Sequence, residues 1–100
     1  MPLYHSKRTE TFKKWIAKLR DQRARARISE YLERLLEGNF SNVKPLGGGI
    51  SELRIDYGPG YRVYYTEKNG MIILLLAGGD KSTQDKDIAK ARKLAQEWKE

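Results

Sequence analysis

The residues with the clearest chemical meaning in this sequence are cations on or beside predicted strands. Arg54 belongs to one predicted strand and Arg62 to the next, so side chains pointing to the same side of the sheet would converge across the hairpin. Lys81 follows the third predicted strand and would close the cluster, while Lys44 comes immediately before the first. Such a cluster suits RNA, because guanidinium groups bind phosphate through paired hydrogen bonds and tyrosine stacks on unpaired bases.

The same cluster suits cleavage of RNA without a metal ion. In that reaction the 2′-hydroxyl attacks the adjacent phosphate, and fixed cations offset the charge that builds around the phosphorus. A structural explanation fits the spacing equally well: Glu52 and Asp56 would form ion pairs with Arg54 and Arg62 across the strands. Spacing alone leaves both explanations open.

Other kinds of site have little support in the sequence. The single histidine, His5, stands apart from any cluster of carboxylates, and we predict a surface residue, no metal site and no cofactor. The glycines at 47–49 are not followed by the Lys-Ser/Thr pair of a Walker phosphate loop. Asp80, Asp85 and Asp87 stand near the start of the last predicted helix, where acidic residues usually complement the helix dipole.

Hydrophobic spacing predicts a helical hairpin in the first half of the chain. A short strand over residues 3–6 is followed by Thr9, which can cap a first helix, and Asp21 can cap a second one. The second helix extends to Glu37, with Gly38 in the left-handed position after it. Apolar residues recur at helical spacing in both segments: Phe12, Trp15, Ile16 and Leu19 in the first, and Ala24, Ile28, Tyr31, Leu32 and Leu35 in the second.

After Pro45 the hydrophobic period changes from 3.6 to 2, which predicts strands over residues 50–57, 61–66 and 71–76. Turns fall at Gly58-Pro59-Gly60 and Lys68-Asn69-Gly70, and the third run is apolar on both faces, so we expect a central, buried strand. The residues from Gly78 onward lead into a final helix capped by Ser82 or Thr83. Its expected core face comprises Ile88, Ala91, Leu94, Ala95 and Trp98. Helices and strands are segregated along the chain, which predicts an α+β fold.

Charge is the first clue to a partner. The 100 residues carry 20 Lys and Arg against 13 Asp and Glu, a net charge of +7 that is concentrated in the first half. This asymmetry favours RNA, DNA or an acidic protein segment as partner. Part of this positive charge lies along one side of the second predicted helix, on Arg20, Arg23, Arg27 and Arg34. A solvated surface is the commoner explanation of such a row.

Length and composition fit a single domain over residues 1–100. The sequence has no cysteine, no signal peptide and no apolar run long enough to span a bilayer, so we expect a cytoplasmic protein without membrane contact.

Several segments closely resemble the phage-derived, RelE/HigB-like killer proteins of addiction modules, in the RelE/ParE superfamily. They are Lys44-Pro45-Leu46, the run from Ser51 through Gly58-Pro59-Gly60-Tyr61-Arg62 to Tyr64, the run Leu74 to Gln84, and Asp87-Ile88. The resemblance implies a RelE-like fold, in which an N-terminal helical hairpin packs on a three- to four-stranded antiparallel sheet with a C-terminal helix. It also implies a toxin that inhibits translation as a ribosome-dependent mRNA endonuclease. Its partners would be the ribosome, mRNA and a helix-turn-helix antitoxin, with DNA contacted only through that antitoxin.

The resemblance also assigns roles to individual residues. Arg62 is similar in position to the phosphate-binding arginine of the superfamily, and Arg54 and Lys81 match basic residues of its active site. We therefore expect these three to be catalytic. The RNA-binding residues expected around them are Lys44, Tyr61, Tyr64, Gln84, Arg23 and Arg27.

One departure from the family pattern keeps a second function open. The nucleases of this family place a Tyr or His near the C-terminal helix, whereas no Tyr or His follows Tyr65 in this chain. This favours the alternative of a ParE-like toxin that poisons DNA gyrase without cleaving RNA, although the cationic strand face disfavours it. A third alternative is an interaction module whose basic helices only hold an acidic partner.

Overall fold

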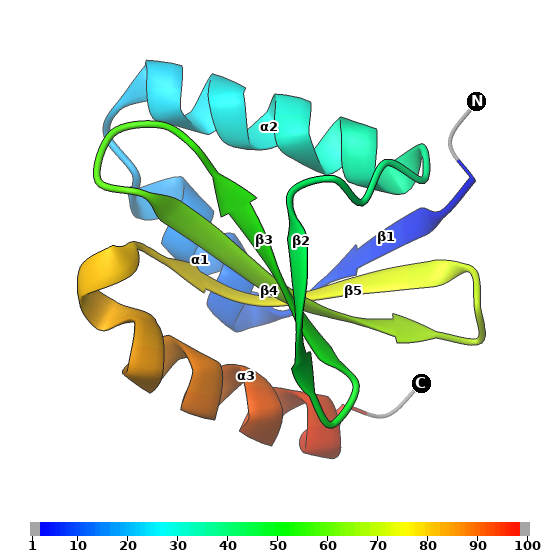
Figure 1. Ribbon diagram of the computed structural model, residues 1–100. Coiled ribbons are helices and arrows are strands. Elements are labelled where there is room, and N and C mark those ends of the chain that lie inside the picture. Colours follow the sequence, from blue (N-terminus) through cyan, green and yellow to red (C-terminus); the bar gives the residue numbers. More distant parts are fainter. Residues whose placement is uncertain (1–2, 99–100) are drawn as a thin grey trace.

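A computed structural model describes residues 3–98, which form a five-stranded sheet with helices on both of its faces (Figure 1). The elements in chain order are β1 (His5–Arg8), α1 (Glu10–Lys18), α2 (Gln22–Leu36), β2 (Val43–Gly47), β3 (Ile50–Ile55), β4 (Tyr61–Lys68), β5 (Ile72–Gly79), a 3₁₀ turn (Lys81–Thr83) and α3 (Gln84–Glu97). The strand order is β1-β5-β4-β3-β2, with β1 parallel to β5 and the other pairs antiparallel. The predicted α+β class, the helical hairpin, the three-stranded meander and the C-terminal helix are confirmed.

The sheet differs from the prediction at both edges. Its first strand spans His5–Arg8 rather than residues 3–6, and all four of its side chains are exposed, so it lacks the alternation that marks strands in a sequence. Lys44 and Pro45 lie inside the edge strand β2 rather than ahead of the sheet. Proline is tolerated there because an edge strand needs hydrogen bonds on only one side. The sheet therefore has five strands instead of three to four.

The two N-terminal helices begin where their capping residues predict. Thr9 Oγ1 accepts a hydrogen bond from the backbone N–H of Phe12 at 3.0 Å, and the Asp21 carboxylate accepts two at the start of α2. Gly38 ends α2 in the left-handed region at φ +89°. Together the helices cover one face of the sheet and form a core of Phe12, Ile28, Leu32, Leu35, Leu53, Ile55, Val63, Tyr65, Ile73 and Leu75.

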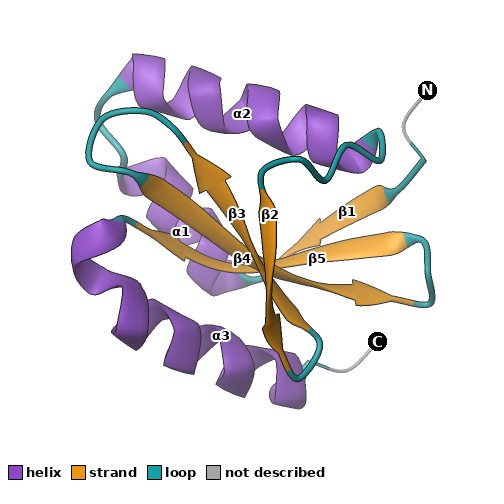
Figure 2. Cartoon of the chain, in the orientation of Figure 1, coloured by secondary structure: helices purple, strands orange, loops and turns teal. Residues whose placement is uncertain are grey.

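The opposite face of the sheet is covered by α3 (Figure 2). Its predicted core face is confirmed: Ala91 is buried, and Ile88, Leu94, Ala95 and Trp98 pack partly buried against Ile50, Tyr64, Leu74, Leu76 and Ala77. Thr83 takes the predicted cap position, but its hydroxyl donates to the Asp87 carboxylate at 2.6 Å instead of capping the backbone. Helices on both faces also confirm that the third strand of the meander is buried and interior.

The end of β5 brings α3 close to the sheet. The strand continues through Gly78 and Gly79, beyond the predicted end at residue 76. A Cβ atom on Gly78 would overlap the ring of Trp15 from α1, and one on Gly79 would overlap the carboxylate of Asp87 from α3. The two glycines therefore let helices from opposite sides approach the same strand, and this places the start of α3 beside the start of β4, where Arg62 pairs with Gly79.

Candidate functional site

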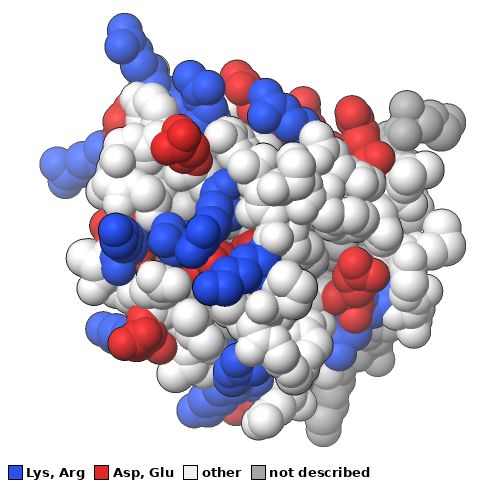
Figure 3. Space-filling view, in the orientation of Figure 1, with Lys and Arg blue, Asp and Glu red and all other residues white. Residues whose placement is uncertain are grey.

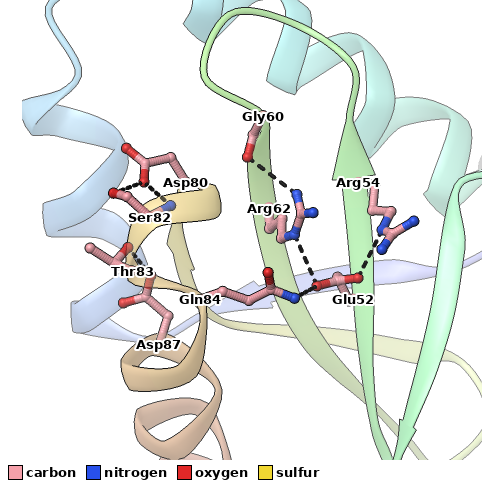
Figure 4. A network of polar contacts seen from close by, with 9 residues as sticks. All are labelled: Glu52, Arg54, Gly60, Arg62, Asp80, Ser82, Thr83, Gln84 and Asp87. Atoms are coloured by element: carbon pink, nitrogen blue, oxygen red, sulfur yellow. Dashed lines mark hydrogen bonds and ion pairs between the residues drawn. The ribbon is translucent and has the colours of Figure 1, made fainter.

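Arg54 and Arg62 meet as the strand pattern predicts. The β3–β4 register pairs them directly, so both side chains stand on the face covered by α3 (Figure 4). Like charges directly opposite each other on neighbouring strands are destabilising. A compensating charge is therefore needed between them.

Glu52 provides that charge from the same strand as Arg54. Its side chain is fully buried, and its two oxygens separate the arginines: Oε2 lies 3.1 Å from Nε of Arg54, and Oε1 lies 3.2 Å from Nε of Arg62. Gln84, from the first turn of α3, donates a hydrogen bond to Oε1 at 3.1 Å. The ion pairs that the sequence allowed as a structural explanation thus form with Glu52. Asp56 takes part in no ion pair within residues 3–98.

A pocket of about 600 Å³ opens beside this network. Arg62 is largely buried at its floor, with 11% of the side chain exposed, whereas 51% of the Arg54 side chain is exposed. Nη1 of Arg62 also donates to the carbonyl of Gly60 at 3.3 Å. Basic side chains gather around a small acidic patch on this face of the molecule (Figure 3). The lining residues are Asn42, Arg54, Ile55, Asp56, Gly60, Arg62, Lys81 and Gln84.

Lys81 reaches the pocket from a rigid turn. The carboxylate of Asp80 accepts hydrogen bonds from the backbone N–H of Ser82 at 2.8 Å and from its hydroxyl at 2.5 Å. These bonds hold the pKa of the Asp80 carboxyl below its ordinary value. Asp80 therefore acts as the cap of the 3₁₀ turn, in agreement with the structural role predicted for it, and the turn fixes the backbone from which Lys81 projects.

The two tyrosines expected to bind RNA do not line the pocket. Tyr64 pairs with Glu52 on the pocket face, but α3 covers it completely, and its hydroxyl finds no hydrogen-bond partner in the described part of the chain. Burial and the nearby charge of Glu52 raise its pKa above the ordinary value. Tyr61 faces the helical hairpin, with its ring 6.3 Å from that of Trp15. Tyr64 is thus not exposed to a base, whereas Tyr61 is half-buried outside the pocket lining, and the RNA-binding role expected of both tyrosines stays a prediction.

The remaining predicted residues divide between the pocket and other surfaces. Gln84 lines the pocket, but Lys44 is exposed on β2 outside the lining. Arg23 and Arg27 project from α2, where the guanidinium of Arg27 lies 5.6 Å from the ring centre of Tyr57. The structure therefore brings together Arg54, Arg62, Lys81 and Gln84, and it leaves Lys44, Arg23 and Arg27 outside the pocket lining.

Two further residues of the site, Asn42 in the pocket lining and Glu52 beside it, were not predicted from the sequence. Asn42 lines the pocket just before β2, in a segment without any pattern that marks it. Glu52 was considered only as an ion-pair partner, although a usable signal existed. Glu52 is two residues after the apolar Ile50 on the same strand, so both side chains point to the same face of the sheet. An acidic residue beside a buried apolar one was the signal.

Another hollow, of about 430 Å³, lies between α1 and α3 and provides a contrast. Lys14, Lys18 and Lys90 line it together with Trp15, but these lysines are exposed and no carboxylate holds them within 4.0 Å among residues 3–98. The pocket of Arg54 and Arg62 is the better candidate because a buried carboxylate holds these two arginines before any ligand binds.

Residues 3–98 contain no group of three or more His, Asp or Glu side chains that could hold a metal ion. Within the same range, no helix has the length and apolar character needed to cross a membrane.

The fold is that of RelE toxins. A double arginine-to-alanine variant of E. coli toxin RelE in the free state matches with a TM-score of 0.75 and 19% identity, covering 93% of this chain and 97% of that one. The toxin–antitoxin complex RelBE2 from Mycobacterium tuberculosis contains a chain that matches with a TM-score of 0.64 and 23% identity, covering 81% of this chain and 100% of that one.

The family follows from the sequence. The family described as phage derived protein Gp49-like (DUF891) matches residues 14–99, and the chain belongs to this family. An uncharacterized protein of Haemophilus influenzae is 55% identical over 91 residues, which cover 91% of this chain and 92% of that protein. The predicted family resemblance is thereby confirmed.

Proposed function

We propose that this protein is the toxin of a type II toxin–antitoxin module and that it cleaves mRNA on the ribosome. The observation that carries the proposal is the pocket in which Arg54, Arg62 and Lys81 converge around a buried carboxylate. Membership in a phage-derived family and a fold shared with RelE toxins support the class of protein. The pocket supports RNA as the substrate, because Arg54 and Arg62 both line it and guanidinium groups bind phosphate.

The reaction needs no group other than the RNA and the side chains of the pocket. The 2′-oxygen forms a bond to the adjacent phosphorus and loses its proton, the bond from phosphorus to the 5′-oxygen breaks, and the leaving oxygen gains a proton. The products are a 2′,3′-cyclic phosphate and a 5′-hydroxyl. Arg54 and Arg62 would offset the charge on the nonbridging oxygens as the pentacoordinate phosphorus forms.

Proton transfer falls to the two remaining titratable groups of the lining. The carboxylate of Asp56 would accept the proton of the 2′-hydroxyl, and the ammonium group of Lys81 would donate a proton to the leaving oxygen. This assignment replaces the Tyr or His of related nucleases with residues from the β3–β4 loop and from the 3₁₀ turn.

The decisive experiment maps mRNA 5′ ends in a bacterial translation extract that contains the purified protein. We expect cuts within translated message that require ribosomes and leave 5′-hydroxyl ends. They should be lost with Arg62→Ala and retained with Arg20→Ala, a matched change of one exposed arginine outside the pocket. Intact message in the presence of a growth-arresting protein would refute the nuclease proposal, and an SOS response in cells would then favour DNA gyrase as the target.

The partner that we propose is a helix-turn-helix antitoxin, with DNA contacted through that protein only. The exposed arginines of α2 and the pocket cations are surfaces that acidic segments of such a partner would neutralise. Co-expression of the protein encoded next to this one should restore growth, and the toxin should elute with it as a complex. We place both in the cytoplasm, where translation occurs.

A further inference from the structure

The carboxylate of Glu52 does more in the pocket than balance charge. A guanidinium group carries five N–H donors, one on Nε and two on each terminal nitrogen. Glu52 contacts both arginines at Nε, through a hydrogen bond of 3.1 Å with Arg54 and an ion pair of 3.2 Å with Arg62, whose Nε has no hydrogen-bond partner within residues 3–98. The terminal nitrogens form the fork that binds two oxygens of a phosphate, and within the same residues they make no hydrogen bond to this carboxylate.

The fork of each arginine is largely unoccupied. Arg62 uses one terminal nitrogen to donate to the Gly60 carbonyl at 3.3 Å, and the Arg54 side chain makes no other hydrogen bond within residues 3–98. Figure 4 shows the two side chains approaching Glu52 from neighbouring strands. A long side chain that is fixed in this way has lost its rotamer freedom before the ligand arrives, so binding and catalysis need not supply that ordering.

Glu52 is itself held in place. Its side chain has no exposed surface, it lies in the middle of β3, and Gln84 donates to Oε1 at 3.1 Å. The hydrogen bond from Gln84 connects the network to the first turn of α3. The carboxylate thus forms a fixed point against which both arginines are aligned.

We propose that Glu52 is the positioning residue of the site: it orients Arg54 and Arg62 for a phosphate in the transition state and, in doing so, weakens binding of the ground state. This inference rests on the proposed function. Its two parts act in opposite directions, because a carboxylate behind the cations reduces the attraction of the pocket for RNA while it aligns the groups that stabilise the reacting phosphate.

The opposite directions make the proposal testable with Glu52→Gln. We expect the variant to bind RNA about threefold to tenfold more tightly, since one negative charge leaves the pocket. We expect kcat for mRNA cleavage to fall about 10- to 100-fold, since the arginines lose their alignment. A purely structural role would weaken binding and cleavage together, and a purely electrostatic role would not lower kcat.

The binding probe is a single-stranded trinucleotide RNA with 2′-O-methyl groups, which cannot be cleaved, and Kd is measured by titration. The kinetic substrate is mRNA on programmed ribosomes, with kcat and KM determined separately. Glu33→Gln removes the same charge from an exposed position on α2 and should change neither quantity. Thermal unfolding of each variant establishes that it is folded.

A second variant keeps the proposal falsifiable if Glu52→Gln does not fold. Glu52→Asp retains the charge but draws the carboxylate back by one methylene, so Kd should stay near that of the wild type while kcat falls. Unchanged kcat in a folded Glu52 variant, or parallel loss of affinity and kcat, would overturn the positioning role even though the wild-type protein cleaves mRNA. Absence of cleavage by the wild-type protein would instead overturn the proposed function, and this inference with it.

Discussion

At the scale of the residue, the two arginines of the pocket differ in what they do for the folded state. Arg62 has 11% of its side chain exposed and Arg54 has 51%, although both contact the same buried carboxylate. A buried carboxylate that loses a buried partner is costly, whereas an ion pair to a half-exposed side chain contributes little because water screens it. The two arginines should therefore differ more in their contribution to the free energy of unfolding than in their contribution to RNA cleavage.

We predict that Arg62→Ala lowers the free energy of unfolding by about 2–4 kcal/mol and that Arg54→Ala lowers it by less than about 1 kcal/mol. Urea unfolding of the two variants measures both values. Arg62→Lys is the useful companion, because it restores a cation near Glu52 without the planar fork. It should recover part of the stability but not the cleavage activity. Equal destabilisation by the two alanine variants would contradict the assigned difference in burial.

At the scale of the element, the end of β5 positions the site. The Gly78-Gly79 pair allows Trp15 of α1 and Asp87 of α3 to contact the strand from opposite faces. Helix α3 then begins where Gln84 reaches Glu52 and where the preceding turn directs Lys81 into the pocket. Anything that pushes a helix away from these glycines should disturb the site from a distance.

Gly78→Ala tests this packing. The added methyl group would overlap the ring of Trp15, so we expect a loss of about 1–3 kcal/mol in the free energy of unfolding, measured by urea denaturation. In a Trp15→Leu background the same substitution should cost much less, because the ring that it meets is gone. Additive effects of the two substitutions would show that the contact does not limit the approach of α1.

Sequence patterns predicted the helices and central strands of this fold better than the edge strands of the sheet and the surroundings of the site. Periodicity and caps located both helices of the hairpin, since Thr9 and Asp21 act locally. They placed the first strand at residues 3–6 instead of His5–Arg8, which is exposed throughout, and they missed β2, which contains Pro45. Strand parity placed Arg54 and Arg62 together correctly. It could not show that α3 covers Tyr64, since that depends on tertiary packing rather than on local pattern.

At the scale of the whole molecule, positive charge extends well beyond the pocket. The net charge of +7 includes the arginines of α2, and Arg27 of that helix lies over Tyr57, the residue after Asp56 of the pocket lining. An RNA that occupies the pocket and continues past the β3–β4 loop would therefore meet Arg27 and then Arg23. The RNA-binding role predicted for Arg23 and Arg27 thus stays a prediction. Only an RNA long enough to extend beyond the pocket would contact them.

The salt dependence of binding separates the two surfaces. For single-stranded RNA, log Kobs falls with log salt concentration with a slope of about −0.7 for each phosphate contact. A tetranucleotide, whose three phosphates can each contact one of the three pocket cations, should give a slope of about −2, and an RNA of about twelve nucleotides that also contacts Arg23 and Arg27 should give about −3.5. The double change Arg23→Ala and Arg27→Ala should return the slope of the longer RNA to that of the tetranucleotide, and it should leave the slope of the tetranucleotide unaffected. Equal slopes for short and long RNA would confine the substrate to the pocket and leave the α2 arginines to a protein partner.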